Sequence, residues 1–150
     1  MHTPSTAPQQ IKRVLLADDD PAVRESLSVL LTDEGYSVLP AEDGGQALEL
    51  VAHNPVDLVI LDLNMPIKNG WDTFERLTEL HPLVPVIIIT ARPNQLFTAV
   101  NAGAGALLEK PMDMRTLLRA MKRLLAESAT TRLERLTGRS TVFHYASGQP

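Results

Sequence analysis

The sequence contains no cysteine, which excludes a disulfide framework and a zinc site built on thiolates. Its longest apolar runs, "VDLVIL" and "VPVIII", are far too short to cross a bilayer, so no contact with a membrane is expected. No long basic block is present and the formal net charge is −4, so direct binding of nucleic acid is not expected either. The start, "MHTPSTAPQQ", lacks the basic and apolar stretches of a signal peptide. These absences predict a cytoplasmic protein.

The composition is that of one folded domain. Hydrophobic residues make up 44% of the 150 positions, which is enough for a core in a chain of this length. We expect a flexible lead at residues 1–10 and a folded domain at 11–127. We also expect a flexible tail at 128–150, which is too short to form a second, output domain. The alternative is a tail that docks on the segment 91–103 through Val142, Phe143 and Tyr145.

Short apolar segments alternate with amphipathic ones along the predicted domain. The expected strands are 11–17, 36–40, 57–61, 84–90 and 106–110. The expected helices are 21–34, 44–54, 71–81, 94–102 and 112–127. Strands that are joined by helices must be parallel, with right-handed crossovers. The pattern therefore predicts an α/β fold with a doubly wound, five-stranded parallel sheet, (βα)5, and a ligand site at the carboxyl ends of the strands.

Polar residues occupy the ends of the predicted strands. The first strand runs into three consecutive aspartates, Asp18, Asp19 and Asp20, and the third, fourth and fifth strands end in Asp62, Thr90 and Lys110. Parallel strands bring these positions to one edge of the sheet. Carboxylate oxygens are the ligands that Mg²⁺ prefers, and a hydroxyl and an ammonium suit a phosphoryl group.

The three aspartates divide into two roles. Asp20 precedes Pro21, which suits the first position of a helix, so Asp20 is expected to cap that helix. Asp18 and Asp19 then remain as the acidic pair that holds a metal. Taken one at a time, these aspartates also fit a solvated loop, and Lys110 also fits a surface position. The complete set of strand-end residues favours the site.

Four motifs in this order resemble the receiver domain of two-component response regulators. They are "LLADDDPAVR", "DLVILDLNMPIKNG", "VIIITA" and "LLEKP". The resemblance covers residues 11 to about 127 and is to the single-domain, chemotaxis-regulator-like members. It implies the flavodoxin-like strand order 2-1-3-4-5. It also implies phosphorelay signalling, with a phosphoryl group received from a sensor histidine kinase or a histidine phosphotransfer protein.

The resemblance implies a role for each strand-end residue. Asp62 would be the phosphoacceptor, and Thr90 and Lys110 would contact the phosphoryl group. The Mg²⁺ ligands would be Asp19, Asp62, the backbone carbonyl of Asn64 and, through a water, Asp18. The family often has a cis peptide bond at the place of Lys110–Pro111, so one is expected here.

The sequence departs from the family pattern in the region of the switch. Leu107 stands where the family commonly has tyrosine or phenylalanine, and the segment from Thr90 to Lys110 is about two residues short. We therefore expect a truncated helix at 94–102. Arg92 lies beside the path of an attacking water and is expected to lengthen the lifetime of the phosphoryl group, with a solvated arginine as the alternative. We expect Leu96 and Phe97 to face a partner, with core packing as the alternative.

The leading interpretation is a signalling module rather than a conventional enzyme. It would catalyse its own phosphorylation and dephosphorylation, and it would bind an unknown downstream protein in a phosphorylation-dependent way. One alternative is an interaction domain that keeps the fold and signals without phosphate. Another is a Mg²⁺-dependent hydrolase with an aspartyl nucleophile. The hydrolase is disfavoured because "DLN" offers no general acid two residues after Asp62.

Overall fold

The computed structural model of the chain describes residues 10–64, 70–140 and 142–148. The strands are β1 (Arg13–Ala17), β2 (Ser37–Ala41), β3 (Leu58–Asp62), β4 (Val86–Thr90), β5 (Ala106–Glu109) and β6 (His144–Ala146). The helices are α1 (Pro21–Asp33), α2 (Gly44–His53), α3 (Gly70–Leu80), α4 (Leu96–Ala102), α5 (Met114–Ala126) and α6 (Ala129–Leu136). Every strand and helix predicted between residues 11 and 127 is present, with boundaries shifted by up to two residues.

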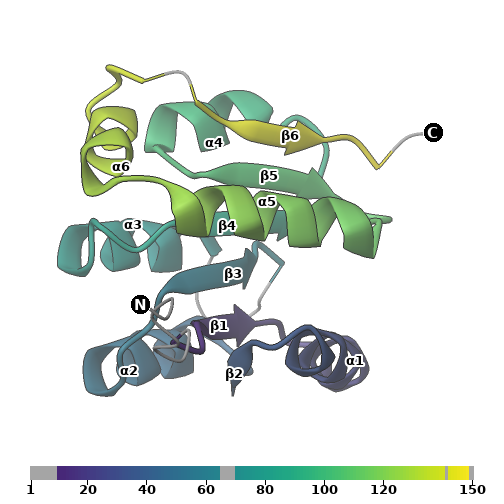
Figure 1. The fold of residues 1–150 in the computed structure, drawn as a ribbon. Helices are drawn as coiled ribbons and strands as arrows, with labels where there is room; N and C mark the ends of the chain where they lie inside the picture. Colours follow the sequence, from purple (N-terminus) through teal and green to yellow (C-terminus); the bar gives the residue numbers. More distant parts are fainter. Residues whose placement is uncertain (1–9, 65–69, 141, 149–150) are drawn as a thin grey trace, which may run out of the picture.

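The sheet has the order β2-β1-β3-β4-β5-β6, and every neighbouring pair is parallel (Figure 1). The predicted α/β class and the order of the first five strands are confirmed. The predicted number of five strands is wrong, because β6 pairs with β5 and places Tyr145 opposite Leu107. The sixth strand comes from the segment that the sequence predicts to be a flexible tail.

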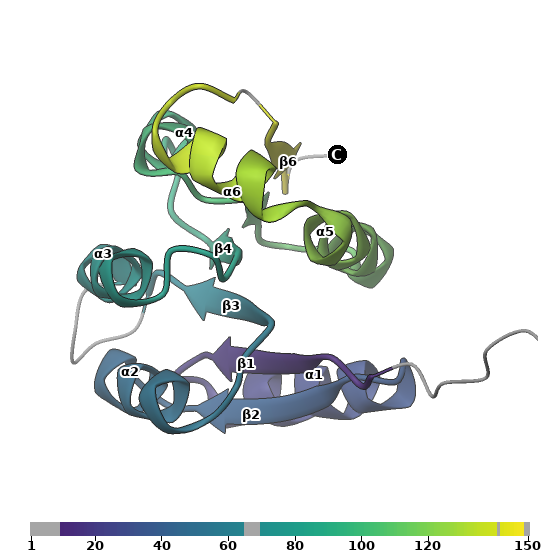
Figure 2. The same cartoon turned by 60° about the vertical axis from the view of Figure 1, so that its left-hand side comes forward.

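The helices cover both faces of the sheet, with α1 and α5 on one face and α2, α3 and α4 on the other (Figure 2). Alternation along β1 shows the two cores. Val14 and Leu16 pack on the α1 and α5 side, whereas Leu15 and Ala17 pack on the opposite side. All the residues of β3 and β4 are buried, as expected for strands covered on both faces. The described part of the chain contains no helix that is long and apolar enough to span a membrane.

α6 is attached to the domain by two arginines, of which Arg135 is buried and Arg132 is half-buried. The Arg135 guanidinium donates to both oxygens of Glu127, at 2.8 and 2.9 Å, and the two side chains are only 5% and 9% exposed. Arg132 donates to the carbonyl oxygens of Leu83 and Leu124, at 3.0 and 2.9 Å. These contacts hold α6 against the end of α5, and the chain then returns along β5 as β6.

α4 is short, as the sequence predicts. It has seven residues, and Gln95, which precedes it, makes no capping hydrogen bond with its side chain. The preceding residue, Asn94, has a φ of 61°, in the left-handed region. The segment between β4 and α4 is therefore a turn without a regular first helical turn.

Candidate cation and phosphoryl site

Three aspartates meet at the carboxyl edge of the sheet, at the ends of β1 and β3. One carboxylate oxygen each from Asp18, Asp19 and Asp62 lie within 4.8 Å of one another. Asp18 and Asp62 are buried, at 2% and 3% exposure, and Asp19 is exposed. Within the described ranges, no other group of three histidine, cysteine or acidic side chains could hold a metal. A donor set made only of carboxylate oxygens fits a hard divalent cation such as Mg²⁺.

The loop after β1 is fixed by its own hydrogen bonds. The Asp18 carboxylate accepts from the backbone N–H of Asp20 at 2.9 Å, and the Asp18 carbonyl accepts from Arg24 Nη1 at 2.7 Å. The Asp20 carboxylate caps α1 by accepting from the N–H groups of Ala22 and Val23, with Pro21 at the start of the helix. The predicted division of the three aspartates is confirmed for Asp20. The sequence did not predict the contact of Arg24 with the Asp18 carbonyl, because no pattern distinguishes Arg24 from the other arginines on helices.

Lys110 bridges the two buried carboxylates from the end of β5. Its Nζ lies 3.1 Å from Asp62 Oδ2 and 4.0 Å from Asp18 Oδ2. The other Asp62 oxygen accepts from the N–H of Asn64 at 2.9 Å. The Lys110–Pro111 peptide bond is cis, as predicted. One ammonium among three carboxylates leaves the cluster with an excess of negative charge that favours a bound cation.

Burial raises the pKa of Asp18 above its ordinary value of 3.8, and the negative charges of Asp62 and Asp19 act in the same direction. The hydrogen bond from the Asp20 N–H and the charge of Lys110 oppose this rise. The ionised form of Asp18 is therefore disfavoured by its surroundings. A divalent cation at the cluster would reverse that preference, because its charge stabilises the carboxylate.

Thr90 ends β4 next to Lys110. It is fully buried, and its Oγ1 accepts from the N–H of Arg92 at 2.9 Å. The N–H of Lys110 donates to the Thr90 carbonyl at 2.8 Å, which joins the two strand ends. The structure thus brings together all the strand-end residues that the sequence predicts for the site. Arg92 is exposed at its rim.

The returning tail lines the space beside Lys110. A cleft of about 320 Å³ is bounded by Arg92, Glu109 and Lys110 on one side and by Tyr145 and Gly148 on the other. The Tyr145 hydroxyl donates to Glu109 Oε1 at 2.8 Å. A side chain at position 148 would collide with the Lys110 carbonyl, so only glycine allows this approach. The structure follows the docked alternative for the tail, with Tyr145 beside the segment after Thr90. Sequence reasoning missed the added strand and the approach of Gly148 to Lys110, although the β-forming residues of "VFHYA" were a signal.

The predicted switch and output positions have different environments. Leu107 is completely buried in β5, between Ile88 of β4 and Tyr145 of β6. Phe97 is 80% exposed and Leu96 is 37% exposed. The alternative, in which these two α4 residues pack in the core, is wrong for Phe97.

The fold and the site together define a class: doubly wound parallel α/β proteins with an acidic cluster, a threonine and a lysine at adjoining strand ends. The family model of the response regulator receiver domain matches residues 14–122. The chain belongs to this family, whose members are phosphoryl-accepting signalling domains rather than conventional enzymes. The match ends before α6 and β6.

Individual relatives agree with this assignment. Response regulator MprA of Mycobacterium sp. (strain KMS) is 40% identical over 119 residues, which are 78% of this chain and 52% of that protein. Transcriptional regulatory protein CpxR of Escherichia coli (strain K12) is 39% identical over 120 residues, which are 79% of this chain and 51% of that protein. The chain thus spans about half the length of these two curated relatives.

Solved structures share the fold. A CheY-like receiver domain from Methanospirillum hungatei JF-1 is 31% identical with a TM-score of 0.74, over 77% of this chain and 94% of that one. Response regulator TrrA from Thermotoga maritima, solved in complex with Mg²⁺ and BeF, is 31% identical with a TM-score of 0.71. That match covers 76% of this chain and 99% of the TrrA chain.

Proposed function

We propose that Asp62 accepts a phosphoryl group from a phosphohistidine of a sensor histidine kinase or a histidine phosphotransfer protein. The reaction takes place in the cytoplasm, and the phosphorylated chain signals by binding a downstream protein. The observation that carries the proposal is the contact between the Lys110 ammonium and Asp62, at 3.1 Å, inside a cluster of three carboxylates.

The residues at the strand ends supply what phosphoryl transfer to a carboxylate requires. An Asp62 oxygen attacks phosphorus, the P–N bond breaks, and its electron pair leaves with the histidine nitrogen. Attack by an anion on an anionic phosphoryl group needs neutralising charge and exact positioning. Lys110 provides positive charge, and the N–H of Asn64 holds one carboxylate oxygen in place.

Thr90 is placed to contact the transferred group. Its Oγ1 already accepts from the Arg92 N–H, so its own hydroxyl hydrogen is left to donate to a phosphoryl oxygen. Lys110 would exchange its contact with Asp62 for a second phosphoryl oxygen. Both interactions stabilise charge that develops outside the buried carboxylates.

We infer that Mg²⁺ is the cofactor, held by Asp18, Asp19, Asp62 and the carbonyl of Asn64. When bound, it supplies positive charge that offsets the repulsion between the carboxylates and the phosphoryl oxygens. The Mg²⁺ and BeF in the TrrA structure and the all-oxygen donor set of this chain support the inference.

Incubation with acetyl phosphate and Mg²⁺ tests the assignment. Intact-mass analysis should show one added phosphoryl group, which is lost in alkali, and Asp62→Asn should take none. Asp33→Asn, which changes an exposed aspartate at the end of α1, is the matched control and should be labelled like the wild type. Labelling of Asp62→Asn to the wild-type level would refute Asp62 as the acceptor.

A further inference from the structure

β6 forms an edge of the sheet that a partner can reach. It is the last strand in the sheet order and pairs with β5 on one side only, among the residues that the structure describes. The N–H of His144 donates to Gly105 at the β5 side. Because N–H groups alternate in direction along a strand, the N–H of Tyr145 points away from the sheet. An edge with free backbone groups is a template for another strand.

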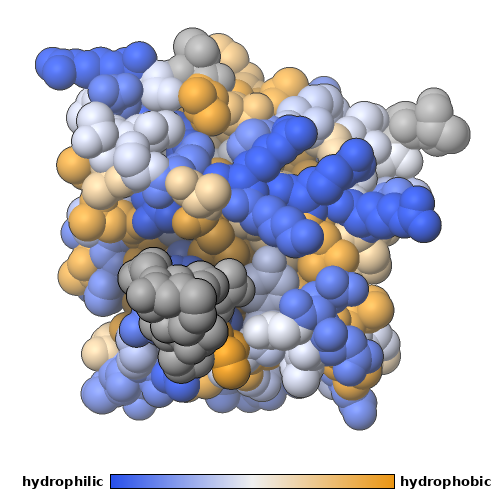
Figure 3. Space-filling model, viewed as in Figure 1, coloured by the Kyte–Doolittle hydropathy of each residue, from blue (hydrophilic) through white to orange (hydrophobic). Residues whose placement is uncertain are grey.

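The side of this edge toward α5 is strongly basic. Arg115, Arg119, Lys122 and Arg123 are exposed at spacings of four, three and one residues, and α5 contains no acidic residue. Figure 3 shows long hydrophilic side chains projecting over α5. We call these four residues the basic face.

The basic face has few partners within the chain. Arg123 makes no hydrogen bond or ion pair among the described residues, and Arg119 reaches only Thr116 Oγ1, at 3.4 Å. The acids at the two ends of α5 are already engaged. Asp113 accepts from the N–H of Arg115, and Glu127 is paired with Arg135.

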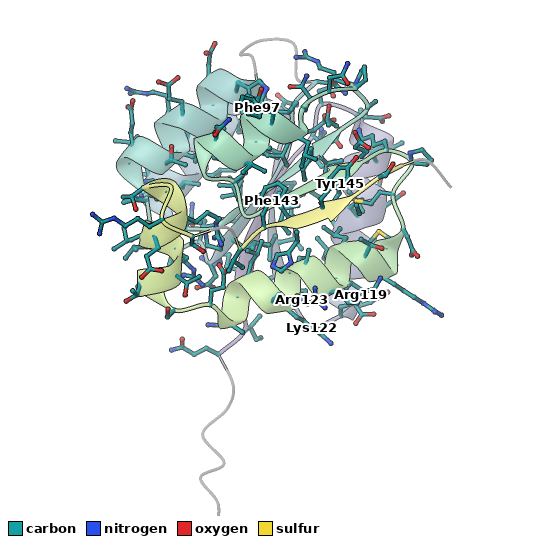
Figure 4. The ribbon with its side chains drawn as sticks, turned by 90° about the horizontal axis from the view of Figure 1, so that it is seen from above. Phe97, Arg119, Lys122, Arg123, Phe143 and Tyr145 are labelled. Carbon is teal, nitrogen blue, oxygen red and sulfur yellow. The ribbon has the colours of Figure 1, made fainter. Side chains whose placement is uncertain are left out.

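A cavity of about 330 Å³ connects the basic face to the edge strand. Arg119 and Arg123 line it from α5, and Phe143, His144 and Tyr145 line it from the tail. Figure 4 shows β6 lying between α4 and α5, with Arg119 and Arg123 on its α5 side. An extended chain laid beside β6 would therefore place side chains next to two guanidinium groups.

The side of the edge toward α4 is apolar. Phe97 is 80% exposed, Val100 44% and Leu96 37%, all on α4. Phe97 and Phe143 both lie on the α4 side of the tail in Figure 4. The two sides of the β6 edge thus differ in chemistry: cationic toward α5 and apolar toward α4.

We propose that the β6 edge binds an extended segment of a protein partner in which acidic and apolar residues alternate. The side chains of a strand point alternately to the two faces of a sheet. In an added strand, acidic residues would face the guanidinium groups of Arg119 and Arg123, and apolar residues would face Phe97 and Val100. The backbone of the segment would accept from the Tyr145 N–H, as in other cases of strand addition.

Charge favours this occupant over two others. Antiparallel pairing with β6 of a second copy, around a twofold axis, would place two basic faces on the same side of one sheet, where they repel. A nucleic acid would meet the basic face but also the −4 net charge of the chain, and it would leave the apolar side without a partner. A peptide in which acidic and apolar residues alternate is complementary to both the cationic side and the apolar side of the β6 edge.

The test uses two labelled peptides of equal length and composition. In one, aspartate and valine alternate, and in the other, all the aspartates precede all the valines. We expect the full chain to bind the alternating peptide at least about tenfold more tightly than the block peptide in a fluorescence anisotropy titration. Binding should also protect the Tyr145 amide from hydrogen exchange. Equal affinities, or no binding of the alternating peptide, would overturn the proposal.

Two double variants distinguish contacts of the peptide with Arg119 and Arg123 from an effect of the net charge of the chain. Arg119→Glu with Arg123→Glu should weaken binding at least about tenfold. Lys12→Glu with Arg76→Glu makes the same charge change at exposed positions elsewhere and should alter affinity by less than about threefold. Equal losses in the two double variants would contradict the assignment, as would tighter binding of a single-stranded oligonucleotide than of the peptide. The titrations use the unphosphorylated chain, which keeps this result independent of the phosphoacceptor assignment.

Discussion

Removal of the Arg135 guanidinium should detach α6 and β6 from the domain. Arg135 and Glu127 form a bidentate pair in which both side chains are more than nine-tenths buried. Arg135→Ala leaves the Glu127 carboxylate buried without its partner. Breaking a buried pair in this way costs about 3 to 5 kcal/mol. The cost falls on α6 and β6 first, because the pair joins α6 to the end of α5.

Hydrogen exchange at the His144 amide measures this cost. That amide donates to Gly105, so it exchanges only when β6 leaves β5. A loss of about 3 kcal/mol corresponds to exchange that is faster by more than about a hundredfold, or to complete loss of protection. Arg139→Ala, at an exposed arginine after α6, is the control and should leave the rate unchanged.

A rescue variant checks the physical reason. Arg135→Met combined with Glu127→Met replaces the pair by apolar side chains and should restore most of the protection, because the desolvation cost of both charges disappears. If Arg135→Ala changes the opening free energy by less than about 1 kcal/mol, as is typical of an exposed pair, the reasoning from burial is refuted.

Two further predictions concern pH and the lifetime of the phosphoryl group. Burial lowers the pKa of His144 below its ordinary 6.5, and the charges of Arg123 and Arg135 act in the same direction against Glu127. Neutral His144 therefore favours the docked tail, so the protection factor of its amide should fall as the pH drops below 6.5 and should level off below the lowered pKa, and His144→Gln should show no such fall. Arg92→Ala should lose its phosphoryl group several-fold faster than the wild type if the guanidinium covers the cleft beside Lys110, and equal rates would remove that role.

The first five strands and their helices could be predicted because local patterns determine them. The continuous apolar run of β3 and the Asp20–Pro21 start of α1 need no distant contact to be recognised. The same patterns define the ends of these elements less well. Residues 11 and 12 were assigned to the first strand, but pairing with β2 begins at Arg13, and Ile11 is 70% exposed.

The tail shows what local patterns miss. β6 has only three residues, too few for a periodic signal. Its position depends on α6, which is held by Arg132 on the carbonyl of Leu83, 49 residues earlier in the chain, and by the Arg135–Glu127 pair. The first contact is too distant for a local pattern to show, and the second depends on the turn between α5 and α6, which has no periodic signal.

The sequence predicts which residues form the site, but not the contacts between their side chains. Parallel strands bring Asp18, Asp62, Thr90 and Lys110 to one edge whatever the side-chain conformations are. The bridging position of Lys110 and the contact of Arg24 with the Asp18 carbonyl depend on rotamers and loop shape. These properties become visible only in three dimensions.

The approach of Gly148 to Lys110 places the end of the described chain next to the carboxyl edge of the sheet. The last described residue lies against the carbonyl of Lys110, whose ammonium contacts Asp62. A fluorophore attached just beyond this point would be tethered beside the acidic cluster without replacing any residue in it. Such a label would report directly on rearrangement at the strand ends, whereas a bulky fusion joined at the same place would obstruct access to the proposed phosphoacceptor.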